Sequence, residues 1–271
     1  TCSSMHKSSD LIGCKSGKPS ISVIIPVYRN RETISSLASR ADAVLEDSSR
    51  SHEIIFVDDA SPDDSWAVIR ELAAANPHVR GLRHTRNLSQ HEAVLTGLAH
   101  ASGDVSVTMD ADLQDPPEAI PSLLDALRCS DADVVFAGRI GNYQSWYRMI
   151  TSRLYRALLL GWLTRLPSDA GMFFAIRRSA LARVLALRSP GQASVIGMIA
   201  AAQLRSGSVP VPRARRRHGY SAYTTGCRVR SALHMARCTL FAKPASHGPI
   251  QGTDAGAKID SSCNLTGGES R

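Results

Sequence analysis

Short apolar runs alternate with segments of helical periodicity in the first half of the chain. Residues 21–27 form an apolar, β-branched run with a proline near its end, which is typical of a buried parallel strand that leads into a loop. Residues 31–45 carry apolar side chains at helical spacing, and residues 53–57 form a second apolar run. These three segments predict a βαβ unit.

The same alternation continues to residue 140. A helix is predicted over residues 61–75, because Ser61 can cap it and acidic side chains fill its first turn. The other predicted elements are strands at 81–84, 105–109 and 134–137 and helices at 89–98 and 116–127. Strands and helices in this order are typical of an α/β, Rossmann-like fold, with a mostly parallel sheet and helices on both faces.

Polar residues follow three of the predicted strands, at residues 28–30, 58–59 and 110–115. In a doubly wound sheet, ligands bind beyond the carboxyl ends of the strands, so we expect the binding site there. The chain lacks the glycine-rich dinucleotide loop and the Walker sequence. The sequence therefore does not favour hydride transfer with a dinucleotide cofactor or phosphoryl transfer by a P-loop enzyme.

Oxygen-bearing side chains alternate just after the strand at 105–109, at Asp110, Asp112 and Gln114. This spacing suits a hard divalent cation such as Mg²⁺ or Mn²⁺ on a diphosphate. The alternative is a solvated acidic turn that caps the next helix. Asp58 and Asp59 can likewise accept hydrogen bonds from a base or ribose, or cap the helix that follows them.

Charge is unevenly distributed. Residues 1–133 carry 12 Lys and Arg against 20 Asp and Glu, whereas residues 134–253 carry 18 against a single acid, Asp169. Such a basic half can hold nucleic acid, a phosphorylated substrate or an anionic membrane surface. No nucleic-acid-binding motif accompanies the arginines, and only 5% of residues are aromatic, so stacking surfaces for bases are scarce. We therefore expect no nucleic-acid partner.

The amino-acid composition further limits the class of protein to which the chain can belong. With 43% apolar and 21% charged residues, the chain is expected to fold. The six cysteines include no close pair, so the sequence predicts neither a zinc site nor a redox motif. Free thiols indicate an intracellular protein. Arginines interrupt the longest apolar segment, residues 154–166, so no transmembrane helix is predicted.

Five ordered motifs now add up to a family resemblance. They are Ser22-Val-Ile-Ile-Pro-Val-Tyr28-Arg-Asn30, Val57-Asp-Asp59-Ala-Ser-Pro-Asp, Arg86-Asn87-x-x-Gln90, Asp110-Ala-Asp112-Leu-Gln114-Asp115-Pro-Pro-Glu and Arg216-x-x-Gly219-x-Ser221-x-Tyr223. The chain resembles family 2 glycosyltransferases of the GT-A fold, and among them the polyprenyl-phosphate sugar transferases. The resemblance covers residues 21–240.

The resemblance implies a nucleotide-sugar donor site in the acidic half. Its nucleotide-binding residues would be Pro26, Tyr28, Asn30, Val57, Asp59 and Asp110, and its metal ligands Asp110, Asp112 and Gln114. Two positions depart from the family pattern. Asn30 stands where an acid is common, and Ser89 stands where glycine is frequent, so the nucleotide stays open between UDP and GDP.

The resemblance also gives the basic half a role. Its residues Arg139, Arg153, Arg216, Ser221 and Tyr223 would bind the acceptor phosphate. Asp169 aligns with an acid beside the acceptor in such enzymes, where it would orient hydroxyls; alternatively it pairs with nearby arginines. We therefore count Asp112, Arg139, Arg153, Asp169 and Arg216 as candidate catalytic residues.

The implied reaction is attack of a polyprenyl phosphate oxygen on the anomeric carbon, with inversion and departure of the nucleoside diphosphate. Two alternatives stay open. Sugar transfer to a polysaccharide or protein hydroxyl would require a catalytic base, for which Asp169 is the candidate. A degenerate, non-catalytic relative would only bind anionic membranes.

These expectations also divide the chain. Residues 1–20 are expected to form a flexible leader, residues 21–133 the nucleotide-sugar half, residues 134–240 the acceptor half and residues 241–271 a disordered tail. Residues 150–163 mix arginine with leucine and tryptophan, which suits a helix at the lipid headgroups or one that faces the core. We expect a cytoplasmic protein bound peripherally to the inner membrane face; its oligomeric state stays open.

Overall fold

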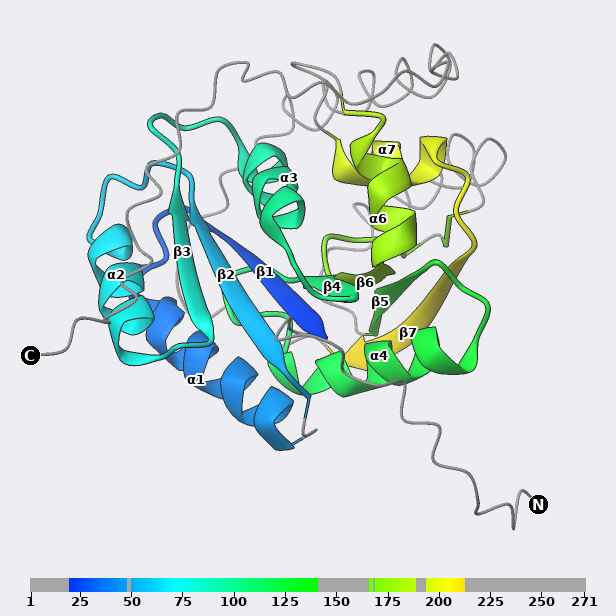
Figure 1. The fold of residues 1–271 in the computed structure, drawn as a ribbon, viewed down its shortest axis with the longest axis horizontal. Helices are drawn as coiled ribbons and strands as arrows, with labels where there is room; N and C mark the ends of the chain where they lie inside the picture. The colour runs from blue at the N-terminus through cyan, green and yellow to red at the C-terminus, as the bar shows by residue number, and fades with distance from the viewer. Residues whose placement is uncertain (1–19, 48–49, 141–165, 168, 189–193, 213–271) are drawn as a thin grey trace, which may run out of the picture.

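The computed structural model describes residues 20–47, 50–140, 166–167, 169–188 and 194–212. The elements in chain order are β1 (Ile21–Val27), α1 (Arg31–Asp47), β2 (His52–Asp58), α2 (Ser65–Ala75), β3 (Val79–Arg83), α3 (Gln90–His100), β4 (Val105–Thr108), η1 (Pro117–Ala119), α4 (Ile120–Cys129), β5 (Val134–Ile140), β6 (Phe174–Arg177), α6 (Arg178–Leu185), α7 (Val195–Ala201) and β7 (Ser206–Pro212) (Figure 1).

The strands form one seven-stranded sheet in the order β3-β2-β1-β4-β6-β5-β7. Neighbouring strands run parallel except at β6, which is antiparallel to both β4 and β5. The predicted α/β architecture with a mostly parallel sheet is therefore confirmed. Because β6 runs backwards, its first residue, Phe174, lies at the same edge as the carboxyl ends of β4 and β5.

β1 lies within the sheet, and all of its side chains are buried. Strands covered on both faces need such a continuous apolar run. Pro26 is compatible with this place because pairing between β1 and β4 ends at Ile24 and Thr108, two residues earlier. The proline thus lies where β1 pairs with β2 alone.

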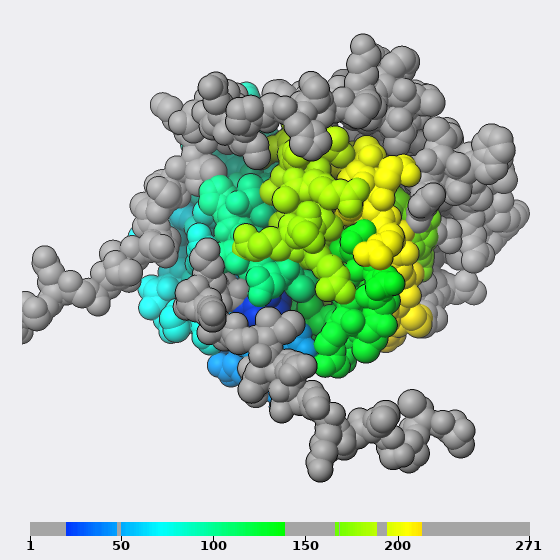
Figure 2. Space-filling model, turned by 45° about the vertical axis from the view of Figure 1, so that its right-hand side comes forward, coloured from blue at the N-terminus to red at the C-terminus, as the bar shows by residue number. Residues whose placement is uncertain are grey.

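Helices cover both faces of the sheet (Figure 1). On one face, alternate β1 side chains such as Val23 and Ile25 join Leu37 of α1, Ile69 of α2 and Leu123 of α4 in one apolar cluster. On the other face, a second cluster combines buried side chains of β5 and β6 with those of α3, α6 and α7. Figure 2 shows α3 and α6 side by side on the outside of this second layer.

Two predicted boundaries are corrected. The strand predicted at 81–84 spans Val79–Arg83 instead. The helix predicted from Ser61 begins at Ser65, because the backbone N–H of Ser61 donates to Asp58 and its hydroxyl accepts from the Arg29 N–H. Both groups of Ser61 are thus used in the loop before the helix.

Several predictions fall on residues that the structure does not describe. These are the leader up to residue 19, the amphipathic segment 150–163 and the tail from residue 241. Within the described ranges, no helix is both long and apolar enough to cross a membrane.

Candidate functional site

The loops after β1, β2 and β4 meet at the carboxyl edge of the sheet, as the strand-end pattern predicted. The Arg29 N–H donates to the Ser61 hydroxyl at 3.2 Å, which ties the first loop to the second. The Thr33 hydroxyl at the start of α1 donates to the Ala111 carbonyl at 2.6 Å, which holds the third loop. These hydrogen bonds make one connected rim from segments far apart in sequence.

Backbone strain is concentrated on this rim. Among the described residues, five non-glycine residues have a positive φ, and four of them are Arg29, Ala60, Ser89 and Leu113. All four lie in loops at the carboxyl edge, whereas the fifth, Gln203, lies between α7 and β7. Residues with left-handed φ cost about 1–3 kcal/mol each and gather at binding sites, where the surrounding structure enforces them. The strain therefore points to the same edge as the polar residues.

The nucleotide-binding residues predicted in the first two motifs reach this rim in different ways. Pro26 and Val57 pair across β1 and β2 just beneath it, and the Val57 side chain is fully buried. Tyr28 is 40% exposed, and the amide oxygen of Asn30 accepts a hydrogen bond from the Tyr28 N–H at 3.3 Å. The Tyr28 ring is thus partly exposed, with the Arg29 guanidinium 5.3 Å from its centroid, whereas Asn30 shapes its own turn; contact of Tyr28 with a nucleotide stays a prediction.

Asp59 is turned inward rather than toward solvent. Its Oδ1 contacts His84 Nδ1 at 2.7 Å and accepts from the Leu88 N–H at 2.8 Å, while its Oδ2 accepts from the Ser89 N–H at 2.9 Å. Burial acts to raise the pKa of Asp59, but these hydrogen bonds hold that pKa below its usual value. Asp59 therefore anchors the 86–89 loop, and contact with a nucleotide stays a prediction.

His84 completes this buried network, which the sequence did not predict. Its Nε2 lies 3.0 Å from the Thr96 hydroxyl on α3, so the ring links β3 to that helix. Asp58, next to Asp59, forms a separate ion pair with Arg83 at 3.1 Å. Burial is the main cause that raises the pKa of Asp58, against hydrogen bonds from Ser61 and the charge of Arg83 that lower it.

Ser89 occupies a backbone conformation that suits glycine, with φ 120° and ψ 158°. We expect Ser89→Gly to raise the free energy of unfolding by about 1 kcal/mol, since relief of strain outweighs the few tenths lost with the cap to Glu92. Urea unfolding measures this change. The control is Ser89→Ala, which keeps the β-carbon but loses the cap and should therefore lower the free energy of unfolding. If the Gly variant is no more stable than the Ala variant, the backbone at residue 89 is not strained.

The predicted metal-binding turn is held in place from two sides. Gln90 at the start of α3 donates to Asp110 Oδ1 at 2.6 Å. Asp112 Oδ1 accepts from the backbone N–H of Gln114 at 3.1 Å, which closes a tight turn around Leu113. Both carboxylates are half-buried at the rim.

This turn fits a hard divalent cation. Asp110 and Asp112 supply carboxylate oxygens from one short segment, and Mg²⁺ and Mn²⁺ prefer such oxygen ligands. The Gln114 backbone is already used to orient Asp112, and whether its side chain acts as a ligand stays a prediction.

Asp169 lies at the same edge, against β5 and β7. The Ser208 hydroxyl donates to Asp169 Oδ2 at 2.8 Å. The carboxylate packs onto Gly138, where an added β-carbon would come within 2.0 Å of Asp169 Oδ2 and 2.5 Å of Ser208 Oγ. Ser208 is the hydrogen-bond partner of Asp169 among the described residues, and the pairing with arginines that the alternative expected stays a prediction.

Gly138→Ala should lower the free energy of unfolding by about 1–2 kcal/mol, because the Asp169 carboxylate and the Ser208 hydroxyl must both move away. Gly207→Ala is the matched control on β7, since its β-carbon would meet side chains at 3.7 Å and 3.9 Å. Urea unfolding of both variants is the measurement. Equal stabilities for the two variants would contradict the close packing of Asp169.

The predicted acceptor residues are less completely placed. Arg139 lies in β5, near its carboxyl end. Arg153, Arg216, Ser221 and Tyr223 lie outside the described residues. The sequence also pointed to Gln90 only as part of a motif, and no pattern indicated Ser208 or Thr33.

Comparison with known proteins agrees with this geometry. The family model described as "Glycosyl transferase family 2" matches residues 22–185. The undecaprenyl-phosphate 4-deoxy-4-formamido-L-arabinose transferase of Edwardsiella ictaluri is 36% identical over 206 residues, 75% of this chain and 62% of the relative. The enzyme of that name from Sodalis glossinidius is 36% identical over 207 residues, 75% of this chain and 63% of the relative. The chain thus spans less than two thirds of these relatives.

Solved structures show the same fold. Glucosyl-3-phosphoglycerate synthase from Mycobacterium tuberculosis, in complex with Mn²⁺, UDP-glucose and phosphoglyceric acid, superposes with a TM-score of 0.60 at 20% identity, over 86% of this chain and 84% of that one. The predicted GT-A fold is therefore confirmed. Since the family model covers more than half of the residues and the sheet has the matching architecture, the chain belongs to glycosyl transferase family 2.

Proposed function

We propose that this chain transfers a sugar from a nucleotide-sugar to a polyprenyl phosphate. The observation that carries the proposal is the 36% identity over 206 residues to undecaprenyl-phosphate sugar transferases. The site described above supports it, because the Asp110–Asp112 turn stands at the edge of the sheet where a diphosphate would bind.

The donor is proposed to lie across the loops after β1, β2 and β4. Tyr28 offers an exposed ring to the base, and the half-buried Asp110 and Asp112 would hold Mg²⁺ or Mn²⁺. When bound, the cation neutralises negative charge on the diphosphate leaving group. Gln90 and Thr33 hold the turn before the substrate arrives, so little reorganisation is required at the moment of reaction.

The proposed acceptor site requires positive charge to attract the acceptor phosphate, rather than a strong catalytic base. A lipid phosphate is already an anion, so it requires little help to lose a proton but must approach an anionic donor. Arg139 on β5 and Arg153 and Arg216 farther along the chain are proposed to bring the two together. The phosphate oxygen bonds to the anomeric carbon as the bond to the diphosphate breaks, with inversion and without a covalent enzyme intermediate.

The acceptor also determines the proposed location. A polyprenyl phosphate resides in a membrane, so the enzyme must work at its surface. The net charge of residues 134–253, with 18 basic residues against one acid, favours the anionic inner face.

The proposal is tested with purified protein, Mg²⁺ or Mn²⁺, undecaprenyl phosphate and a panel of radiolabelled UDP- and GDP-sugars. We expect label from one donor to enter the organic phase only when metal is present. Donor binding in calorimetry without label in the organic phase would overturn the lipid acceptor, and absence of donor binding would leave the non-catalytic alternative.

Substitution of Asp169 distinguishes a lipid phosphate acceptor from a hydroxyl acceptor. Its carboxylate stands at the rim with one bond from Ser208, as a catalytic base could. If a phosphate is the nucleophile, Asp169→Asn should retain measurable transfer while Arg153→Ala loses it. The reverse pattern would favour a hydroxyl acceptor.

A further inference from the structure

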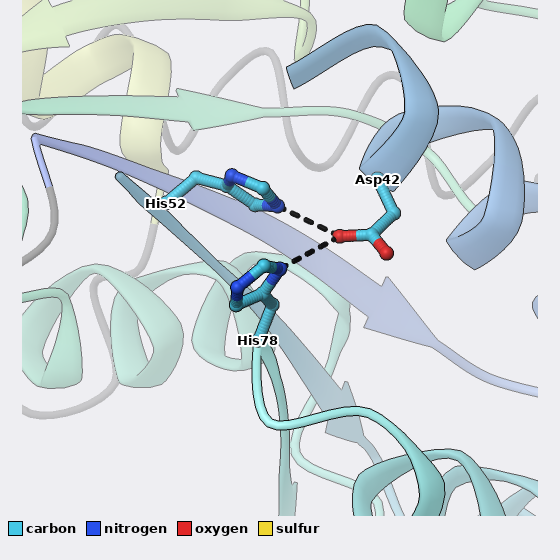
Figure 3. Close-up of side chains that lie close together, drawn as sticks. All are labelled: Asp42, His52 and His78. Carbon is cyan, nitrogen blue, oxygen red and sulfur yellow. Dashed lines mark hydrogen bonds and ion pairs between the residues drawn. The ribbon is translucent and has the colours of Figure 1, made fainter. Parts of the chain in front are cut away.

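Three possible metal ligands meet at the edge of the sheet opposite the proposed active site. Asp42 lies in the later part of α1, His52 is the first residue of β2, and His78 directly precedes β3. Figure 3 shows both imidazole rings turned toward the Asp42 carboxylate. Since parallel strands begin at the edge away from their ligand-binding ends, this cluster is separate from the Asp110–Asp112 turn.

The distances approach those of a metal site. Asp42 Oδ1 lies 2.7 Å from His52 Nε2 and 3.1 Å from His78 Nδ1, and the three ligand atoms all lie within 4.8 Å of one another. A tetrahedral Zn²⁺ with bonds of about 2.0–2.1 Å places neighbouring ligand atoms about 3.3 Å apart. Small outward shifts of the two rings would therefore admit the ion.

Each ligand is oriented by a partner outside the cluster. His52 Nδ1 lies 3.1 Å from the Arg50 carbonyl, which can only accept, so that nitrogen carries a proton. Asn76 donates to Asp42 Oδ2 at 2.7 Å, and the Asn76 side-chain oxygen accepts from the backbone N–H of His78 at 2.8 Å, which fixes the main chain there. His52 thus has the arrangement common among ligating histidines, which donate their other ring N–H to a carbonyl or carboxylate.

The Asp42 carboxylate and the His52 ring already face each other away from solvent. Asp42 Oδ1 lies 2.7 Å from His52 Nε2, and the His52 side chain is only 2% exposed. Burial acts to raise the pKa of Asp42, but hydrogen bonds from both rings and from Asn76 hold that pKa below its usual value. The Asp42 carboxylate and the two imidazole nitrogens that face it are the kinds of oxygen and nitrogen ligand that a divalent cation binds.

We propose that Asp42, His52 and His78 bind one Zn²⁺, with water completing the coordination. Two imidazole nitrogens favour Zn²⁺ over Mg²⁺ or Mn²⁺, which prefer oxygen ligands alone. The site is accessible, since the His78 side chain is 39% exposed and that of Asp42 18%. Bound there, the ion joins α1 to β2 and to the residue before β3 and so stabilises this edge of the sheet.

The test uses the full chain, stripped with a chelator and titrated with Zn²⁺ against a chromophoric chelator. We expect one Zn²⁺ per chain at this site, and at least tenfold weaker binding in His78→Gln. Zn²⁺ should also raise the Tm of the wild type but not of the variant. The control His100→Gln should bind Zn²⁺ within twofold of the wild type. Neither readout uses sugar transfer, so the result is independent of the proposed function.

Co²⁺ provides a second measurement that needs no variant. Bound to the wild type in a four-coordinate nitrogen and oxygen site, Co²⁺ should give visible absorption well above that of the hexaaqua ion, and Zn²⁺ should displace it. Unchanged Zn²⁺ affinity in a folded His78→Gln, or Co²⁺ absorption no stronger than that of the free ion, would overturn the proposal and leave the cluster as a hydrogen-bonded link only.

Discussion

Asp112→Ala is expected to reduce sugar transfer by about 10²- to 10³-fold. The Asp112 carboxylate, held by the Gln114 N–H at 3.1 Å, is one of the two carboxylates among the predicted metal ligands. Loss of metal-based charge stabilisation costs several kcal/mol in the transition state. The measurement is the initial rate of label entering the lipid phase at saturating donor.

The control for this variant is Asp125→Ala. Asp125 lies on α4, is more than half exposed and pairs with Arg128 one turn later, so its removal should leave the rate unchanged. If Asp112→Ala transfers sugar as fast as Asp125→Ala, the turn after β4 does not hold the catalytic metal.

Asp59→Ala is expected to lower the free energy of unfolding by about 3 kcal/mol or more. The substitution removes the carboxylate that contacts Nδ1 of the buried His84, and it leaves the N–H groups of Leu88 and Ser89 without their acceptor. Each buried donor that is left without its acceptor typically costs about 1–3 kcal/mol, and three donors lose theirs here. Urea unfolding followed by circular dichroism measures the loss.

The matched control is Asp64→Ala, in which an acid that is 73% exposed loses a 3.7 Å ion pair with Arg31. Its stability should stay within about 0.5 kcal/mol of the wild type. An equally small effect in Asp59→Ala would show that the buried network contributes little.

The network also predicts a pH dependence. Because the folded-state pKa of Asp59 lies below its usual value, its contribution to stability is complete above the unfolded pKa and is lost as the pH falls through the folded pKa. Asp59→Asn should therefore lose less stability than the wild type when the pH is lowered over that interval.

Much of the fold was predictable because its strands are buried on both faces. The continuous apolar runs of β1 and β2 are typical of strands that are covered on both faces, so the sequence predicts strands there. The start of α2 was predicted wrongly, because Ser61 makes its hydrogen bonds to Asp58 and Arg29, which are tertiary and not encoded in a local capping pattern. The strand β7 was not predicted, since its burial alternates irregularly and its proline and serine content hides it.

The site was predictable at the level of loops and not of side-chain direction. Strand-end polarity placed Asp59 and Asp110 at one edge, which the sheet confirms. Asp59 turns inward because it contacts His84, and Gln90 reaches Asp110 because of the way α3 packs. Neither contact can be read from local sequence. The cluster of Asp42, His52 and His78 has no recognisable spacing, so only folding brings it together.

The central claim is tested most directly by mass spectrometry of the lipid product formed from undecaprenyl phosphate and the active nucleotide-sugar. Transfer of the sugar alone predicts a lipid with one added sugar and a single phosphate, formed together with free nucleoside diphosphate. A lipid with two phosphates and release of nucleoside monophosphate, or a sugar found only on a water-soluble acceptor, would contradict the account.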